Sequence, residues 1–157
     1  MMEQNIDPHS GRFDGSHHLF AVRVYYEDTD LSGIVYHANY LRWFERARSD
    51  MLRLLKIDQR AAIEAGEGAY AVADLSIRYA APARLDDAVV VESSALGLGA
   101  ASVTLKQRAL RGDMLLAEAQ VRVGFVSPEG RPRRQPTGWR EAFAKLLPAE
   151  KPEIAQA

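Results

Sequence analysis

The sequence predicts an α+β fold in which an antiparallel five-stranded sheet is covered by one long helix. Three observations support this prediction: a single helical stripe of apolar residues, several segments that alternate between apolar and polar residues, and turn signals between the later strands. Hairpin turns argue against parallel crossovers, so the long helix is expected to cover one face of the sheet. A single helix leaves much of the sheet uncovered, and a second subunit is a reasonable cover.

The first strand is expected at residues 20–26, where apolar and other residues alternate with period two. An acidic turn follows and ends at Gly33. The long helix is expected from Tyr40, because the apolar residues that follow fall on one stripe at three-and-four spacing. That stripe comprises Tyr40, Phe44, Ala47, Met51 and Leu55. Asp58 is placed to cap a short second helix that continues through Ile63.

The rest of the chain is expected to form strands and one closing helix. Alternating patterns predict strands at 71–79, from Val89, at 101–109 and at 117–125. Residues 111–113 read Arg-Gly-Asp, which is typical of a tight hairpin. Apolar residues from Trp139 to Leu147 fall on one side of a short helix.

The chain of 157 residues suits one domain with a core of its own. We expect a mobile leader at 1–18, the domain at 19–147 and a frayed tail at 148–157. His9, His17 and His18 suggest a metal site, but no carboxylate or thiol at ligand spacing accompanies them, so a polar tail is favoured.

Composition excludes several classes of protein. The absence of cysteine removes thiol nucleophiles, disulfides and thiolate metal sites, and it fits a reducing compartment. The 20 basic residues nearly balance the 21 acidic ones, so there is no net electrostatic attraction to nucleic acid or to an anionic membrane. No apolar run is long enough to span a membrane, and no secretory signal is present, so a cytoplasmic location is expected.

Two carboxylates, Asp28 and Asp30, lie shortly before the start of the long helix. Residues 28–33 also match the start of a calcium-binding loop, but the twelfth position is Asn39 rather than Glu, and a strand precedes the loop. Asp28 is interpreted as a capping residue. A carboxylate beside the free amides of a first helical turn can instead act on a substrate carbonyl. No cofactor or metal is expected.

Two motifs identify a resemblance to a known family. The first runs from Val22 to Asp30 and continues through Gly33, Val35-Tyr36-His37, Tyr40 and residues 45–48, which read Glu-Arg-Ala-Arg. The second, at residues 79–87, reads Tyr-Ala-Ala-Pro-Ala-Arg-Leu-Asp-Asp. Together they resemble the Tol-Pal-associated acyl-CoA thioesterases of the YbgC type, which are relatives of 4-hydroxybenzoyl-CoA thioesterase with the hotdog fold. The resemblance covers about residues 20–147.

The resemblance implies that Asp30 is the catalytic carboxylate, acting as nucleophile or as general base on water. Amides near Tyr36 and His37 would hold the thioester oxygen. His37 could also act through its ring or serve only as a capping residue. The expected site residues are Asp30 and His37 for catalysis, Gly33, Tyr36 and Glu45 for the oxyanion or substrate, and Arg131, Arg133 and Arg134 for coenzyme A phosphates.

Partners and alternatives follow from the same resemblance. An acyl-CoA substrate with a short, medium or aromatic acyl group is expected, and a homodimer or homotetramer is implied. Acyl carrier protein is a further candidate partner. The rival interpretation is a non-catalytic adaptor that binds acyl carrier protein or envelope-biogenesis proteins. A dehydratase is disfavoured because its motif context is missing.

Overall fold

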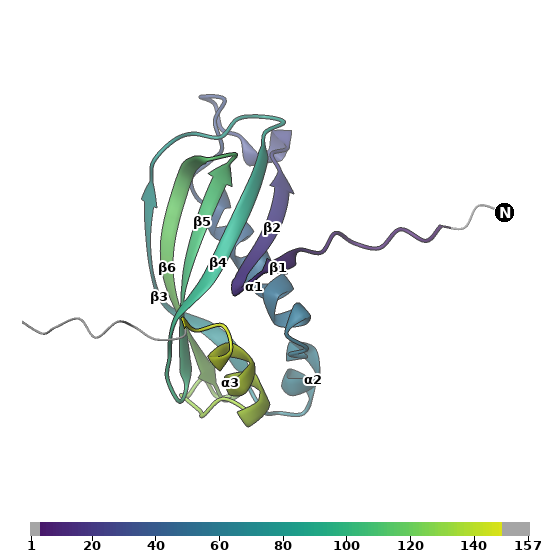
Figure 1. The fold of residues 1–157 in the computed structure, drawn as a ribbon, viewed down its shortest axis with the longest axis vertical. Helices are drawn as coiled ribbons and strands as arrows, with labels where there is room; N and C mark the ends of the chain where they lie inside the picture. The colour runs from purple at the N-terminus through teal and green to yellow at the C-terminus, as the bar shows by residue number, and fades with distance from the viewer. Residues whose placement is uncertain (1–3, 149–157) are drawn as a thin grey trace, which may run out of the picture.

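A computed structural model describes residues 4–148 of the chain. One antiparallel sheet has the strand order β1-β2-β4-β5-β6-β3 (Figure 1). Its strands are β1 (Arg12–Asp14), β2 (His17–Arg23), β3 (Ala69–Tyr79), β4 (Ala88–Leu98), β5 (Ser102–Arg111) and β6 (Met114–Val126). The α+β fold class and the four later strands are therefore confirmed. The neighbouring β4, β5 and β6 are successive along the chain, as their turn signals predicted.

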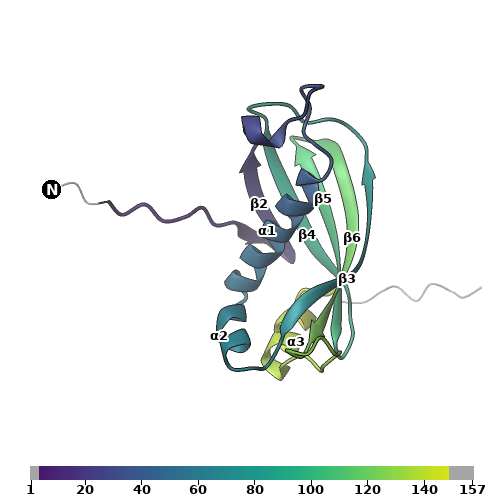
Figure 2. The same cartoon turned by 180° about the vertical axis from the view of Figure 1, so that it is seen from behind.

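The long helix α1 (Asn39–Leu54) lies along one face of this sheet (Figure 2). Tyr40, Phe44, Ala47 and Met51 from the predicted stripe are all buried, and Leu55 packs against the same core. On the sheet side, alternate residues of β6 from Ala117 to Phe125 are also buried, as the pattern predicted. The core therefore lies between α1 and the sheet, where apolar area is removed from water on both sides.

Two short helices lie at the same end of the sheet, away from the start of α1 (Figure 1). Helix α2 (Gln59–Glu64) begins where predicted, and the Asp58 carboxylate accepts a hydrogen bond from the Ala61 amide at 2.9 Å. Helix α3 (Thr137–Ala144) inserts Phe143 into the core. A 3₁₀ turn, η1 (Tyr26–Asp28), replaces the predicted end of the first strand.

The predicted leader was wrong for its second half, because residues 12–14 form β1 and residues 17 and 18 begin β2, with a turn between them. This small hairpin makes the sheet six-stranded rather than five-stranded. Its anchor is His18, which is fully buried and lies 2.6 Å from a carboxylate oxygen of Asp50 on α1. Ser10 and Gly11 donate hydrogen bonds to the same carboxylate. Apart from Pro148, the expected tail at 148–157 lies outside the described residues.

At the other side of the sheet, β3 is an edge strand that pairs only with β6 among residues 4–148. Most of its residues are exposed, including Val72 and Tyr79. No helix among the described residues is long and apolar enough to cross a membrane.

Candidate active site

The loop between β2 and α1 is fixed by the segment that contains the second sequence motif. The Val24 amide donates a hydrogen bond to the Asp87 carbonyl, and the Val35 amide donates to the Ala83 carbonyl. Arg84 helps to hold its own turn, because its amide donates to the Asp87 carboxylate at 2.9 Å. Two motifs far apart in the sequence therefore form one backbone framework, which positions the loop at the start of α1.

Asp30 lies in a tight turn of this loop. Its amide donates to the Ile34 carbonyl, and its carbonyl accepts from the Gly33 amide. Gly33 has a φ of 80°, a conformation that glycine adopts without steric cost. One carboxylate oxygen of Asp30 accepts hydrogen bonds from both the hydroxyl and the amide of Ser32. The second oxygen has no hydrogen-bond donor within residues 4–148.

The environment of Asp30 favours its ionised form. The hydroxyl and then the amide of Ser32 lower the pKa of this carboxyl below its ordinary value, and the positive charge of a protonated His37 acts in the same direction. Asp30 is exposed in the single chain. Such a group is a charged carboxylate at neutral pH.

Asp28 has a different position. Its carboxylate accepts the Tyr25 amide at 2.8 Å, and its carbonyl accepts both the Tyr36 amide and the side-chain amide of Asn39. These contacts attach the loop to the first residue of α1. They match the capping interpretation of Asp28.

The two amides expected to hold an oxyanion are not equivalent. The Tyr36 N–H is occupied, because it donates to the Asp28 carbonyl at 2.8 Å. The N–H groups of His37 and Ala38 have no acceptor in the part of the chain that the structure describes. Free amides at a helix start are available to an anionic ligand. The amides of His37 and Ala38, rather than that of Tyr36, are therefore the expected donors to a thioester oxygen.

Tyr79 at the end of β3 contacts this helix start from the sheet. Its hydroxyl donates to the His37 carbonyl at 2.9 Å, and burial raises the pKa of Tyr79. The carbonyl of His37 and the N–H of Ala38 belong to one planar peptide and point in opposite directions. Tyr79 therefore fixes the orientation of a free amide. The His37 ring lies between Tyr36 and Tyr79, with ring centroids 4.6 and 6.0 Å away.

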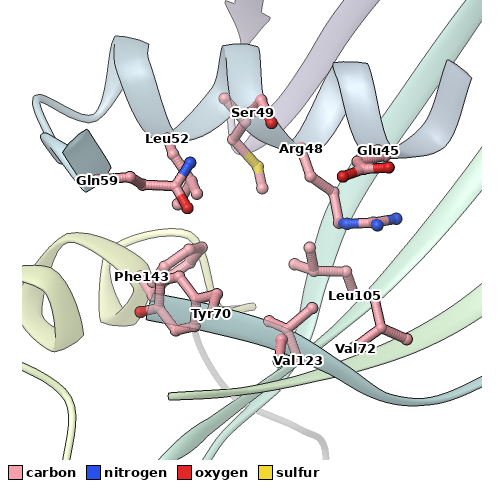
Figure 3. A pocket seen from close by; sticks show the side chains of 12 residues that line it. Glu45, Arg48, Ser49, Leu52, Gln59, Tyr70, Val72, Leu105, Val123 and Phe143 are labelled. Carbon is pink, nitrogen blue, oxygen red and sulfur yellow. The ribbon is translucent and has the colours of Figure 1, made fainter. Parts of the chain in front are cut away.

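Glu45 lies farther along α1, at the edge of a cavity of about 260 Å³ between α1 and β3 (Figure 3). It is exposed and lies six positions beyond Asn39 in the helix, a rise of about 9 Å. Arg48 lines the same cavity. Within a single chain, Glu45 is thus separated from the Asp30 turn.

The segment that contains Arg131, Arg133 and Arg134 is also remote from the Asp30 turn in a single chain. Residues 131–136 lie near α3, at the end of the sheet opposite the start of α1 (Figure 1). The Arg133 guanidinium donates to the carbonyls of Gly66 and Glu67, so it holds the loop after α2. Arg131 and Arg134 are exposed. Contact of these arginines with coenzyme A stays a prediction.

Sequence reasoning missed Ser32 and Tyr79 as parts of the site. Ser32 is two residues from Asp30, and a Ser at this distance is a common local partner for an Asp side chain in a turn, so a signal was present. Tyr79 lies 42 residues from His37. Its place in the second motif was the only signal in the sequence.

Comparisons with known proteins give a consistent result. A model of the thioesterase superfamily matches residues 32–121. The acyl-CoA thioesterase YbgC of Haemophilus influenzae is 44% identical over 107 residues, which are 68% of this chain and 79% of that protein. The acyl-CoA thioester hydrolase YbgC of Escherichia coli O6:H1 is 42% identical over 117 residues, covering 73% of this chain and 87% of that protein.

A solved structure agrees with these matches. The probable thioesterase of Bartonella henselae superposes with a TM-score of 0.73 at 35% identity. The match covers 76% of this chain and 99% of that structure.

Proposed function

The chain belongs to the thioesterase superfamily and is an acyl-CoA thioesterase, and from this premise we propose that the Asp30 carboxylate carries out the hydrolysis. The reaction consumes one water and converts an acyl thioester into a free acid and the thiol of coenzyme A. The hotdog fold and the relatives of the chain support the reaction. The assignment of Asp30 is supported by the site geometry described above.

The proposed chemistry uses one oxygen of Asp30 and the free amides of the helix start. Acting as a base, the carboxylate takes a proton from water, whose oxygen attacks the thioester carbon; the C–S bond then breaks, and the proton passes to the departing thiolate. Acting as a nucleophile, the carboxylate attacks the thioester carbon, the C–S bond breaks with loss of the thiolate, and water then cleaves the mixed anhydride to the free acid and the Asp30 carboxylate. In both routes the thioester oxygen gains negative charge, which the N–H groups of His37 and Ala38 would stabilise.

One observation carries this assignment: within residues 4–148, one carboxylate oxygen of Asp30 has no donor, and the loop that holds it leads into a helix start whose His37 and Ala38 amides have no acceptor. Ser32 occupies the other oxygen and so limits rotation of the carboxylate. A nucleophile or base and an oxyanion donor are the two requirements of acyl transfer. A role for the His37 ring, Gly33 or Glu45 in binding substrate remains part of the proposal.

The proposed assembly is a homodimer or homotetramer. Asp30 is exposed in one chain, whereas hydrolysis of a bound thioester benefits from a site that excludes bulk water. No strand of the described residues pairs with the outer side of β3, and Val72 and Tyr79 leave apolar surface beside it. A second copy paired at this edge would cover both features. Light scattering after size-exclusion chromatography measures the mass, and a monomer at micromolar concentration would refute the assembly.

The test of the function is a hydrolysis screen. Short, medium and aromatic acyl-CoA substrates, and acyl groups on acyl carrier protein, are incubated with the protein, and free thiol is measured with a chromogenic disulfide. Since the chain has no cysteine, the protein contributes no background signal. Turnover of at least one acyl-CoA is expected. Negligible turnover of every thioester, together with co-purification of acyl carrier protein or an envelope-biogenesis protein, would instead support the adaptor interpretation.

A further inference from the structure

Arg111, the last residue of β5, connects the β5–β6 hairpin to the second sequence motif. β5 ends at the end of the sheet where α1 begins (Figure 1). One guanidinium nitrogen of Arg111, Nη1, donates to the Asp87 carboxylate at 2.9 Å and to the Pro82 carbonyl at 3.0 Å. Within residues 4–148, no other group donates to that carbonyl. Arg111 therefore holds both ends of the segment 82–87.

The Asp87 carboxylate closes this segment into a turn. The oxygen that binds Arg111 also accepts the Arg84 amide at 2.9 Å, and the Asp87 amide donates to the Arg84 carbonyl. The hydrogen bond from the Arg84 amide, and then the hydrogen bond and charge of Arg111, lower the pKa of Asp87 below its ordinary value. Asp86 has a φ of 71°, a left-handed conformation that costs free energy in a residue with a side chain. The turn therefore depends on the contacts that hold it.

The segment held by Arg111 supports the loop that carries Asp30. The carbonyl of Ala83, inside the segment, accepts the Val35 amide at 2.9 Å. The preceding residue of the loop, Ile34, accepts the Asp30 amide at its carbonyl, also at 2.9 Å. Two backbone hydrogen bonds therefore join the segment held by Arg111 to the turn that holds the Asp30 carboxylate.

We propose that Arg111 is a positioning residue for thioester hydrolysis, which acts on Asp30 through the segment 82–87. This inference rests on the proposed catalytic role of Asp30. Within the described chain, none of the side-chain hydrogen bonds of Arg111 goes to the Asp30 loop, so its effect on the reaction is indirect. A misplacement of about 1 Å in a reacting group can lower the rate about 10²-fold, even when the altered residue is far from the chemistry.

Arg108 offers a matched control in the same strand. Its guanidinium pairs with Glu92 at 3.3 Å, and the side chains of Arg108 and Arg111 are both 35% exposed. Neither member of the Arg108–Glu92 pair has a side-chain hydrogen bond to the segment 82–87 or to the Asp30 loop among residues 4–148. Removal of either arginine breaks one partly exposed ion pair, so any general loss of stability should be similar.

The experiment measures thiol release from acyl-CoA by the full chain, well below the melting temperature of each variant. Arg111→Met should lower kcat about tenfold with KM within about twofold of the wild type, because the reacting group rather than the substrate is misplaced. Arg111→Lys should keep kcat within about threefold of the wild type, because an ammonium group can also donate to two acceptors. Arg108→Met should keep kcat within about twofold of the wild type.

Asp87→Asn guards against misfolding of Arg111→Met. Asparagine keeps an acceptor for the Arg84 amide and removes only the charge that attracts Arg111. This variant should lower kcat about three- to tenfold with little change in KM. An unchanged kcat in Asp87→Asn, or a change in KM alone in either variant, would contradict positioning of the reacting group.

A double-variant cycle with Asp30→Asn separates this inference from the proposed function. If Arg111 acts through Asp30, adding Arg111→Met to Asp30→Asn should lower kcat less than about threefold further. The positioning role alone is overturned if Asp30→Asn is inactive while Arg111→Met keeps its kcat, if Arg108→Met loses as much as Arg111→Met, or if the full loss recurs in the double variant. Full activity of Asp30→Asn would refute the proposed function, and the positioning role with it.

Discussion

Replacing Asp30 by Asn is the most direct perturbation of the proposed chemistry. The two side chains have the same shape, and Asn can still accept the hydrogen bonds that Ser32 donates. The variant therefore removes the negative charge and the basicity while the turn stays in place. A positioned base or nucleophile typically contributes a factor of about 10² to 10⁴, and we expect kcat to fall by this amount. KM should change little, because the amides of His37 and Ala38 are unaffected.

The assay for this variant is thiol release from the best acyl-CoA substrate of the wild type, measured from pH 5 to 9. Because Asp30 is exposed, the melting temperature should shift by no more than about 2 °C. Glu27→Gln is the matched control, since Glu27 is another exposed carboxylate of the same loop and should keep nearly full activity. A kcat within threefold of the wild type in Asp30→Asn would refute the catalytic assignment.

Three further perturbations test the surroundings of the site and the fold. In Ser32→Ala the pKa of the Asp30 carboxyl should rise, because the hydroxyl's hydrogen bond to the ionised form is lost while the amide's remains, so the acidic limb of the pH–rate profile should move to higher pH; an unmoved limb would contradict this. Tyr79→Phe releases the His37 carbonyl and should lower kcat about three- to tenfold without lowering the melting temperature, whereas a change in KM alone would argue against orientation of the amide. Asp50→Ala removes the acceptor of three donors and should reduce the free energy of unfolding in urea by about 2–3 kcal/mol; a loss below about 0.5 kcal/mol would show that the hairpin is not anchored there.

Local patterns predicted most of the fold because the residues that define each element are close in sequence. The stripe from Tyr40 to Met51 gave α1, the alternation from Ala117 to Phe125 gave β6, and Asp58 marked the start of α2. The patterns in α1 and β6 arise because the apolar residues of one helix or strand recur with its own period and so face the same core. Such signals work best where a single face is buried.

The first hairpin was missed because its stabilising contact is not local. The segment that contains His18 is polar and has no apolar alternation, so its composition is typical of a flexible leader. Its order depends on Asp50, which lies 32 residues away on α1. A buried polar pair gives no periodic signal, although it leaves the Nδ1 atom of His18 buried without a partner in the described chain.

The residues of the candidate site were proposed from the sequence, whereas the hydrogen-bonding state of each group was not predictable from it. Asp30 and the helix start were recognised from motifs, whereas the occupation of the Tyr36 amide depends on a backbone contact with Asp28. Which amides remain free is a property of the folded loop. Likewise, the free oxygen of Asp30 could be assigned only after the contacts of Ser32 were known.

The exposure of Asp30 links the proposed chemistry to the proposed assembly. Hydrogen bonds from Ser32 keep the pKa of Asp30 low, and a carboxylate with a low pKa is a weak base. Burial acts in the opposite direction, because desolvation raises the pKa of a carboxyl. A subunit that covers this turn would therefore increase the basicity of the same group while excluding water from the thioester. The hydrogen bonds from Ser32 would then keep Asp30 ionised, while desolvation by the second subunit would make its carboxylate a stronger base. The hydrogen bonds and the desolvation are therefore complementary.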